Sequence, residues 1–139
     1  MVANAALDIR VPSDVQQIEA IVAQVVRRCR EHQFDGRQLT LNVPVALTEA
    51  LSNAILRGNG DRAGKCVRVR AEVTTVRLIM EVEDEGAGFD LEACTEDPTT
   101  PENLEREDGR GLFLMHALMD RVERFRGEGN VVRLTLHRR

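Results

Sequence analysis

Two runs rich in β-branched residues lie side by side in the middle of the chain, and they constrain the fold more than any other feature. The runs cover residues 66–74 and 76–83, so a single residue separates them. A connection this short permits only a hairpin of two antiparallel strands. The centre of the chain therefore belongs to a sheet, and the remaining segments either pair with it or pack against it.

A short strand and a helix are predicted near the start of the chain. Residues 6–11 alternate between apolar and polar side chains, as a strand does. The helix-start signal Pro12-Ser13-Asp14 follows, and residues 15–26 then carry apolar side chains at helical spacing. We expect this helix to end near Phe34, because Asp35-Gly36 is a turn signal.

A second helix is predicted from about Val43 to Leu56. Pro44 is tolerated in its first turn, and Gly58-Asn59-Gly60 supplies the residues that end a helix. Glu49 and Asn53 are then placed in the middle of this helix, four residues apart.

The segment after the hairpin changes character. Residues 90–108 contain eight acidic side chains, one Arg and two Pro, with almost no apolar periodicity. A loop of this length in a compact domain is usually a lid, a binding loop or disordered. We expect a helix over residues 109–120 after it, and then a closing hairpin formed by residues 121–126 and 131–137.

This order of elements predicts an α+β fold. We expect a two-layer sandwich in which helices cover one face of a mixed, mainly antiparallel sheet. The chain has 139 residues and 42% hydrophobic content, which suffices to bury a core unaided. The sequence shows neither an internal repeat nor a second domain, so one domain over residues 1–139 is predicted.

Composition excludes several classes of protein. The three cysteines are widely spaced and form no CxxC, which fits neither a disulfide framework nor a zinc site. No stretch reaches the roughly 18 apolar residues of a membrane span, and no leader is visible, so we expect a soluble cytoplasmic protein without membrane contact. With a net charge of -4 and no Trp or Tyr, direct nucleic-acid binding is not expected.

Three short motifs occur in one order along the chain. Glu49 and Asn53 share a helix face, where both side chains can point at one metal ion or water. Gly86 and Gly88 follow Asp84, and Gly109-Arg110-Gly111 opens the third helix; such turns let backbone N–H groups approach an anionic ligand. Taken singly, the first motif reads as a solvated helix face and the last as a loop-to-helix joint. Together they indicate a nucleotide site.

The three motifs resemble the N, G1 and G2 boxes of the Bergerat-fold ATPases. The closest likeness is to the bacterial anti-sigma-factor serine/threonine kinases. The segments that carry it are Val45-Ala-Leu-Thr-Glu49-Ala-Leu-Ser-Asn53, Glu83-Asp84-Glu-Gly86-Ala-Gly88-Phe89-Asp90 and Gly109-Arg-Gly111-Leu112-Phe-Leu-Met115. The likeness extends to both edges of the chain, and it implies the Bergerat ATP-binding fold with ATP and Mg²⁺ as ligands.

The resemblance also implies a role for each residue. Asn53 is expected to bind Mg²⁺, Glu49 to orient or deprotonate the attacking hydroxyl, and Asp84 to read adenine. The remaining positions are expected to hold the nucleotide through the base or the phosphates, with Arg110 supplying an added positive charge: Gly86, Gly88, Gly109, Arg110, Gly111 and Leu112.

Two positions depart from the family pattern. Arg57 stands one turn after Asn53, where relatives often carry His, and we expect it to face phosphate. Asn130-Val131 stands where many Bergerat-fold proteins place a Thr near the adenine. Adenine contact through Asp84 and water is the expected substitute.

The function that the resemblance implies is a serine/threonine protein kinase acting as an anti-sigma factor. In such a partner-switching pathway, the kinase binds a sigma factor in one state and phosphorylates a small antagonist protein in another. Relatives often dimerise, so the resemblance also suggests a homodimer for this chain. The alternative is a non-catalytic ATP-binding module that sequesters a protein partner, and Glu49 is the residue that separates the two readings.

Overall fold

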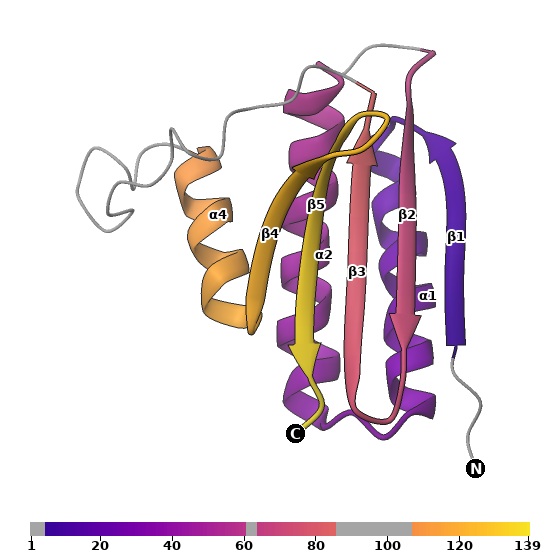
Figure 1. The fold of residues 1–139 in the computed structure, drawn as a ribbon, viewed down its shortest axis with the longest axis vertical. Coiled ribbons are helices and arrows are strands. Elements are labelled where there is room, and N and C mark those ends of the chain that lie inside the picture. Colours follow the sequence, from indigo (N-terminus) through magenta and orange to yellow (C-terminus); the bar gives the residue numbers. More distant parts are fainter. Residues whose placement is uncertain (1–4, 61–63, 86–106) are drawn as a thin grey trace.

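The computed structural model describes residues 5–60, 64–85 and 107–139, and it shows one sheet and three α-helices (Figure 1). The strands pair in the order β1-β2-β3-β5-β4. The elements are β1 (Ala5–Pro12), α1 (Ile18–Glu31), α2 (Val43–Asn53), β2 (Cys66–Val73), β3 (Arg77–Asp84), α4 (Glu107–Leu118), β4 (Arg121–Arg126) and β5 (Asn130–His137).

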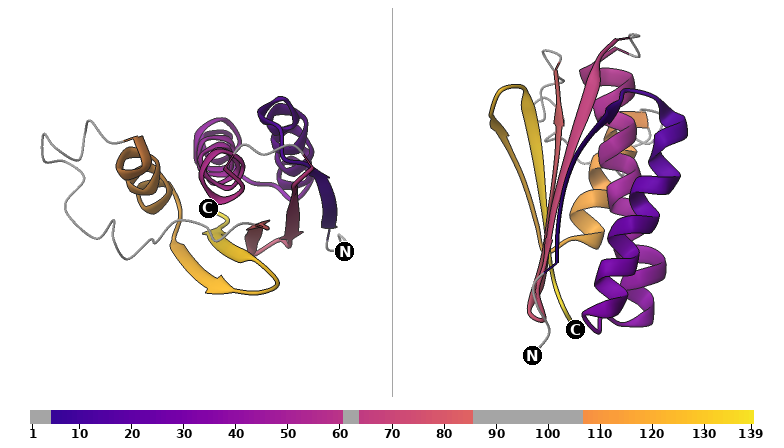
Figure 2. Two further views of the ribbon diagram at one scale, coloured as in Figure 1. Left: turned by 90° about the horizontal axis from the view of Figure 1, so that it is seen from above. Right: turned by 90° about the vertical axis from the view of Figure 1, so that its right-hand side faces the viewer.

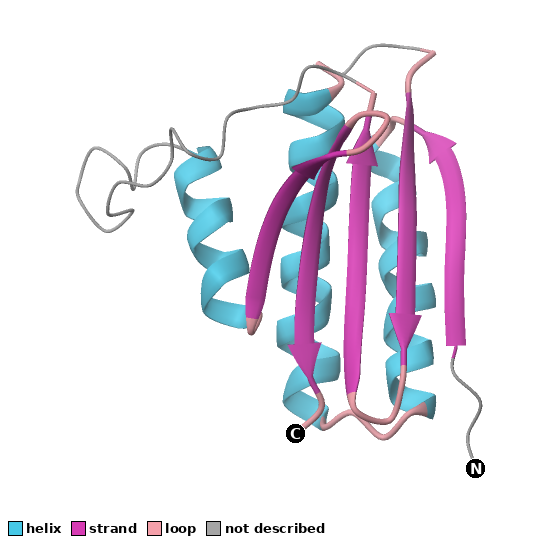
Figure 3. Cartoon of the chain, viewed as in Figure 1, coloured by secondary structure: helices cyan, strands magenta, loops and turns pink. Residues whose placement is uncertain are grey.

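The molecule has two layers, as predicted. Seen from above, α4, α2 and α1 lie in one row over a single face of the sheet (Figure 2), and the other face carries no helix of the described residues (Figure 3). The core lies between the layers. Strand residues at every second position point into it, including Leu7, Val69, Met80 and Leu134, because successive side chains of a strand alternate between faces. The predicted α+β fold is confirmed.

Every described strand pairing is antiparallel, so the sheet is not mixed. The difference arises from the closing hairpin. Strand β4 runs in the same direction as β3 and would form a parallel pair if the two were neighbours. Strand β5 lies between them instead, where it runs antiparallel to both. The last strand in the chain is thus an interior strand of the sheet.

The central helix is longer than predicted. Asp35-Gly36, predicted as a turn, begins the next helix: the Asp35 carboxylate accepts a hydrogen bond from the Gln38 N–H at 2.7 Å, as a helix cap does. The residues before Pro44 form a wide π-helical turn, Gln38–Asn42, in which the Val43 N–H bonds to the Gln38 carbonyl. A proline ring clashes with the carbonyl four residues earlier in a regular helix, and the wide turn accommodates it.

The segment Gln38–Gly58 is the central helical segment of the helix layer. Contrary to the expectation that no stretch reaches the length of a membrane span, this segment would suffice to cross a membrane by length and composition. Half of it is buried inside the fold, however, which is typical of a core helix. It packs between α1 and α4, and Leu47, Leu51 and Ile55 are fully buried there.

The ends of the outer helices also differ slightly from prediction. Helix α1 ends at Glu31 and not near Phe34, because Gln33 takes the left-handed conformation with φ of 68°. Helix α4 begins at Glu107, two residues before the predicted start at Gly109. The predicted lid over residues 90–108 lies outside the described residues up to residue 106.

Candidate functional site

Glu49 and Asn53 lie on one side of α2, next to the first turns of α4. The two helices pack against each other, and Gly111 of α4 lies next to Glu49. A methyl group placed on Gly111 would lie 2.7 Å from Glu49 Oε2 and 3.6 Å from Asn53 Nδ2. The structure therefore brings together Glu49, Asn53 and Gly111, which come from two of the three predicted motifs. Glycine leaves space here that any other residue would fill.

The Asn53 side chain is buried but not fully used by the protein. It is 8% exposed, and its Nδ2 atom has no hydrogen-bond partner among the described residues. A buried amide without a partner costs roughly 1–3 kcal/mol. Because the two ends of an amide are assigned from their neighbours, the atom at this position can equally be the oxygen. A ligand that supplies the missing partner would remove this cost.

Asp84 lies at the end of β3, where the strand meets the helix layer. The side chain is 5% exposed, and Asn130 Nδ2 lies 3.5 Å from its Oδ1 atom. The two residues are paired across β3 and β5. A methyl group on Gly58 would overlap the Asp84 carboxylate, and one on Gly129 would overlap the Asp84 main-chain oxygen. Gly58 thus leaves room for the Asp84 carboxylate, and Gly129 for the Asp84 main chain.

A second π-helical turn brings Gly58 to Asp84. It covers Ala54–Gly58 and starts directly after Asn53. The Asn59 N–H donates to the Ala54 carbonyl at 2.8 Å, five residues back instead of four. Such turns occur frequently at functional sites, because they shift the residues that follow them relative to a regular helix. Here the turn places the end of the helix against the end of β3.

The other predicted site residues have different surroundings. Arg57 is exposed in the π-helical turn. The Leu112 side chain belongs to the hydrophobic core. Gly109 and Arg110 lie in the first turns of α4, where only the backbone is described. Gly86 and Gly88 lie outside the described residues.

Sequence reasoning missed three residues of this region. Gly58 and Asn59 were interpreted only as part of a helix-ending triplet, and Gly129 only as part of a hairpin turn. All three residues are buried. Gly58 and Gly129 approach Asp84, and the side chain of Asn59 accepts a hydrogen bond from the N–H of Glu85, the residue after Asp84. No sequence signal marks Gly58, because its role depends on the approach of Asp84, a residue distant in the chain.

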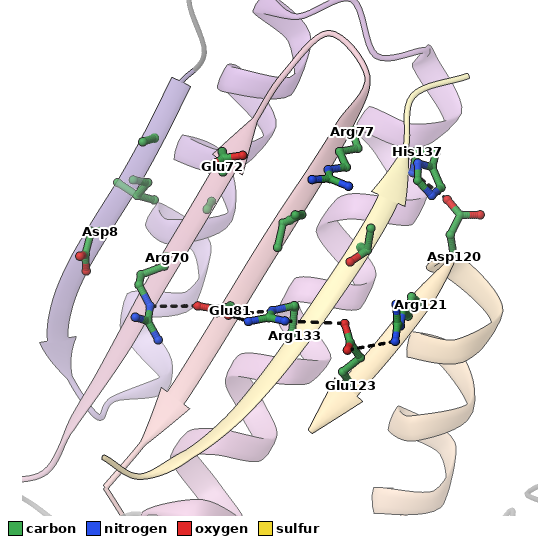
Figure 4. Close-up of a pocket in the computed structure, with 15 residues that line it drawn as sticks. Asp8, Arg70, Glu72, Arg77, Glu81, Asp120, Arg121, Glu123, Arg133 and His137 are labelled. Carbon is green, nitrogen blue, oxygen red and sulfur yellow. Dashed lines mark hydrogen bonds and ion pairs between the residues drawn. The ribbon is translucent and has the colours of Figure 1, made fainter. Parts of the chain in front are cut away.

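A hollow in the described structure lies away from these residues, on the open face of the sheet (Figure 4). It measures about 760 Å³, and its floor carries a row of alternating charges. Arg70 Nε lies 3.1 Å from Glu81 Oε1, Arg133 Nη2 lies 2.7 Å from Glu81 Oε2, and Arg133 Nη1 lies 4.0 Å from Glu123 Oε1. The Arg70 contact is an ion pair whose Nε is not aligned for a hydrogen bond. Volume alone therefore does not identify the site.

The helix-covered antiparallel sheet, with Glu49 and Asn53 beside a glycine of α4 and Asp84 at a strand end, defines a histidine-kinase-like ATP-binding domain. The profile of the histidine kinase-like ATPase domain matches residues 11–136. The chain belongs to this family and, within it, to the anti-sigma-factor kinases.

Three relatives illustrate the kinship. The anti-sigma F factor of Clostridium novyi is 31% identical over 100 residues, which cover 70% of this chain and 69% of that protein. The serine-protein kinase RsbW of Bacillus velezensis is 34% identical over 99 residues, or 68% of this chain and 62% of the relative. RsbW of Bacillus subtilis is 33% identical with the same coverage.

Proposed function

We propose that this chain is an ATP-dependent serine/threonine protein kinase that also acts as an anti-sigma factor. It would phosphorylate a small antagonist protein, and it would bind its sigma factor when the antagonist is absent or phosphorylated. The observation that carries the proposal is the meeting of Glu49, Asn53 and Gly111 in a family whose named members include a serine-protein kinase and an anti-sigma F factor. We place this activity in the cytoplasm, with a homodimer as the assembly to test.

Asn53 is the proposed ligand of Mg²⁺. Its buried amide has an end without a partner among the described residues, and an amide oxygen is a donor that Mg²⁺ accepts. Within residues 5–60, 64–85 and 107–139, no three His, Cys, Asp or Glu side chains gather to hold a metal ion. Mg²⁺ suits one or two protein oxygens, because it keeps several waters and binds substrate phosphates. When bound with ATP, the ion would neutralise charge on the phosphates.

Glu49 is the proposed catalytic residue. It lies one helical turn before Asn53 and is half-buried, so its carboxylate can face both the phosphates and an incoming hydroxyl. A carboxylate within hydrogen-bond reach of that hydroxyl can orient it and accept its proton. The rest of phosphoryl transfer is positioning and charge stabilisation.

The two ends of the nucleotide are assigned to different elements. Asp84 would accept a hydrogen bond from the exocyclic amine of adenine, with Gly86 and Gly88 bending the chain under the base. Gly109, in the first turn of α4, would offer its backbone N–H to the phosphates, where the helix dipole favours negative charge, and Gly111 and Leu112 would shape the space beside it. Arg110 and Arg57 would add positive charge.

The test is transfer of phosphate from ATP to the purified antagonist, measured by mass spectrometry with the wild type, Glu49→Gln and Glu72→Gln. Glu72 is an exposed carboxylate on the open face and serves as the matched control. We expect Glu49→Gln to lower the transfer rate by about 10²- to 10⁴-fold, with ATP affinity nearly unchanged, and Glu72→Gln to behave as wild type.

Two results would count against the proposal. Full transfer by Glu49→Gln would remove Glu49 from the reaction. A wild-type protein that binds ATP and sequesters its partner without ever transferring phosphate would be the non-catalytic module instead.

A further inference from the structure

Asn59 is a buried side chain that the proposed reaction does not use. It follows the π-helical turn and is 2% exposed. Its Oδ1 atom accepts a hydrogen bond from the Glu85 N–H at 2.8 Å. Its Nδ2 donates to Ser13 Oγ at 3.1 Å and to the Cys66 carbonyl at 3.0 Å. Every polar atom of this side chain is therefore bonded to another part of the chain.

These bonds connect four segments at one end of the molecule. The backbone N–H of Asn59 bonds to Ala54, on the helix that carries Glu49 and Asn53. Glu85 is the residue after Asp84, Cys66 begins β2, and Ser13 lies between β1 and α1. The Cys66 N–H closes the network by donating to the Glu85 carboxylate at 2.5 Å. Asn59 thus joins the end of the helix directly to the end of β3.

The geometry points to Asn59 as a positioning residue for the nucleotide. By holding Glu85 against the end of the helix, it fixes how far the Asp84 carboxylate lies from Gly58 and from Asn53. This inference rests on the proposed function, because it assigns the base to Asp84 and the phosphates to the helix side. The two ends of one ATP molecule can be bound together only if these elements keep a constant separation.

Only asparagine satisfies this position with so short a side chain. An aspartate would still accept from the Glu85 N–H, but its second oxygen would face the Cys66 carbonyl, an acceptor opposite an acceptor. An alanine would leave the Glu85 N–H without its acceptor. Alanine releases the end of β3, and aspartate strains it through the repulsion between its second oxygen and the Cys66 carbonyl.

Gln38 provides a matched control at the opposite end of the same helical segment. It is also a buried amide, 1% exposed, with bonds to distant parts of the chain. Its Nε2 donates to the His137 carbonyl at 2.8 Å, and its Oε1 accepts from the N–H groups of Asp35 and Arg139 at 3.3 and 3.4 Å. These partners include no proposed site residue. Loss of Gln38 therefore measures what a buried amide contributes to stability alone.

The experiment compares Asn59→Ala, Asn59→Asp and Gln38→Ala with the wild type. Calorimetric titration gives the Kd for ATP and for ADP, the transfer assay gives kcat and KM, and NMR hydrogen exchange without nucleotide follows the Glu85 amide. We expect both Asn59 variants to raise Kd by about tenfold, equally for ATP and ADP, because the lost alignment concerns the base end. We expect kcat at saturating ATP to change less than threefold, and the Glu85 amide to exchange faster.

We expect Gln38→Ala to lower the melting temperature about as much as the Asn59 variants do. The Kd for ATP and for ADP should stay unchanged in Gln38→Ala. If the Asn59 variants alter Kd no more than Gln38→Ala does, the role of Asn59 is structural and the inference is overturned. An unchanged exchange rate for the Glu85 amide also overturns it, whether or not ATP binds. A wild type that binds no ATP would instead refute the proposed function. Because hydrogen exchange is measured without nucleotide, it tests the role of Asn59 independently of that result.

Discussion

Polar side chains are paired differently on the two faces of the sheet. On the open face, Arg70, Glu81, Arg133 and Glu123 form a row across four strands in which each charge lies beside an opposite one (Figure 4). On the helix-covered side, the amide of Asn53 is buried with one atom unmatched by the described residues. Arg70 Nε makes no hydrogen bond either, but Glu81 compensates its charge at 3.1 Å, whereas a ligand could supply the partner that the Asn53 amide lacks among the described residues. We therefore expect ligand binding on the helix-covered side of the sheet.

The largest difference between the two faces is expected when one carboxylate on each face is replaced. Asp84→Asn keeps the shape of the side chain but removes its charge, so we expect ATP to bind about 10- to 100-fold more weakly, since a bond to a charged group contributes roughly 1.5–3 kcal/mol. Asp8→Asn, the same exchange on the exposed edge of the other face, serves as the control. Calorimetric titration with ATP and GTP checks both. Equal affinities for all three proteins would end the assignment of Asp84.

A smaller effect is expected from filling the space at Gly111. Gly111→Ala places a methyl group 2.7 Å from Glu49 Oε2, closer than carbon and oxygen tolerate, so the carboxylate has to move. We expect kcat to fall by about tenfold, because small displacements of a reacting group are costly. Gly36→Ala is the control, since nothing lies within 4 Å of the added atom. A steady-state assay in which both variants match the wild type would show that this space is not used.

On the open face, the comparison predicts a change in stability without a change in binding. Glu81→Gln removes the carboxylate shared by Arg70 and Arg133, whose side chains are 35% and 37% exposed. We expect the free energy of unfolding to fall by about 0.5–1 kcal/mol, and by less at high salt, because solvent screens such pairs. Urea titrations at two salt concentrations measure this. A weaker affinity for ATP in this variant would contradict the separation of the two faces.

The smallest effect concerns the edge of the open face. The hydrogen bond from Arg68 holds the pKa of Asp8 below its ordinary value of 3.8. A carboxyl with a lowered pKa in the folded protein adds stability above pH 3.8, and that contribution is lost as the pH falls through the lowered value. In Arg68→Gln, we expect the pKa of Asp8 to return towards 3.8 in an NMR titration. An unmoved pKa would mean that the pair does not persist in solution.

The sequence predicted the fold well because its signals are local. Periodicity placed the strands and helices, and the spacing of Glu49 and Asn53 placed both on one helix face, where the structure has them beside Gly111. The assignment of ligand contacts to these residues stays a prediction, as does the single domain over residues 1–139.

Other features could not be predicted, because they depend on partners far away in the chain. The position of β5 between β3 and β4 decides that the sheet is antiparallel, and no local pattern encodes it. The predicted start at Val43 agrees with the start of α2, but the π-helical turns that flank α2 could not be predicted, because such turns have no simple spacing signature. The bonds of Asn59 are set by segments up to 46 residues away.

The place of β5 in the sheet has a consequence for how the molecule assembles. Asp84 pairs with Asn130, which follows it by 46 residues, and until β5 arrives one side of β3 is an open edge with unpaired backbone groups. Contacts between such distant segments form late, because the intervening loop has to close first. During synthesis, the carboxylate assigned to adenine would therefore receive its last neighbours only when the final strand joins the sheet. The capacity to bind nucleotide would then report that β5 has joined the sheet.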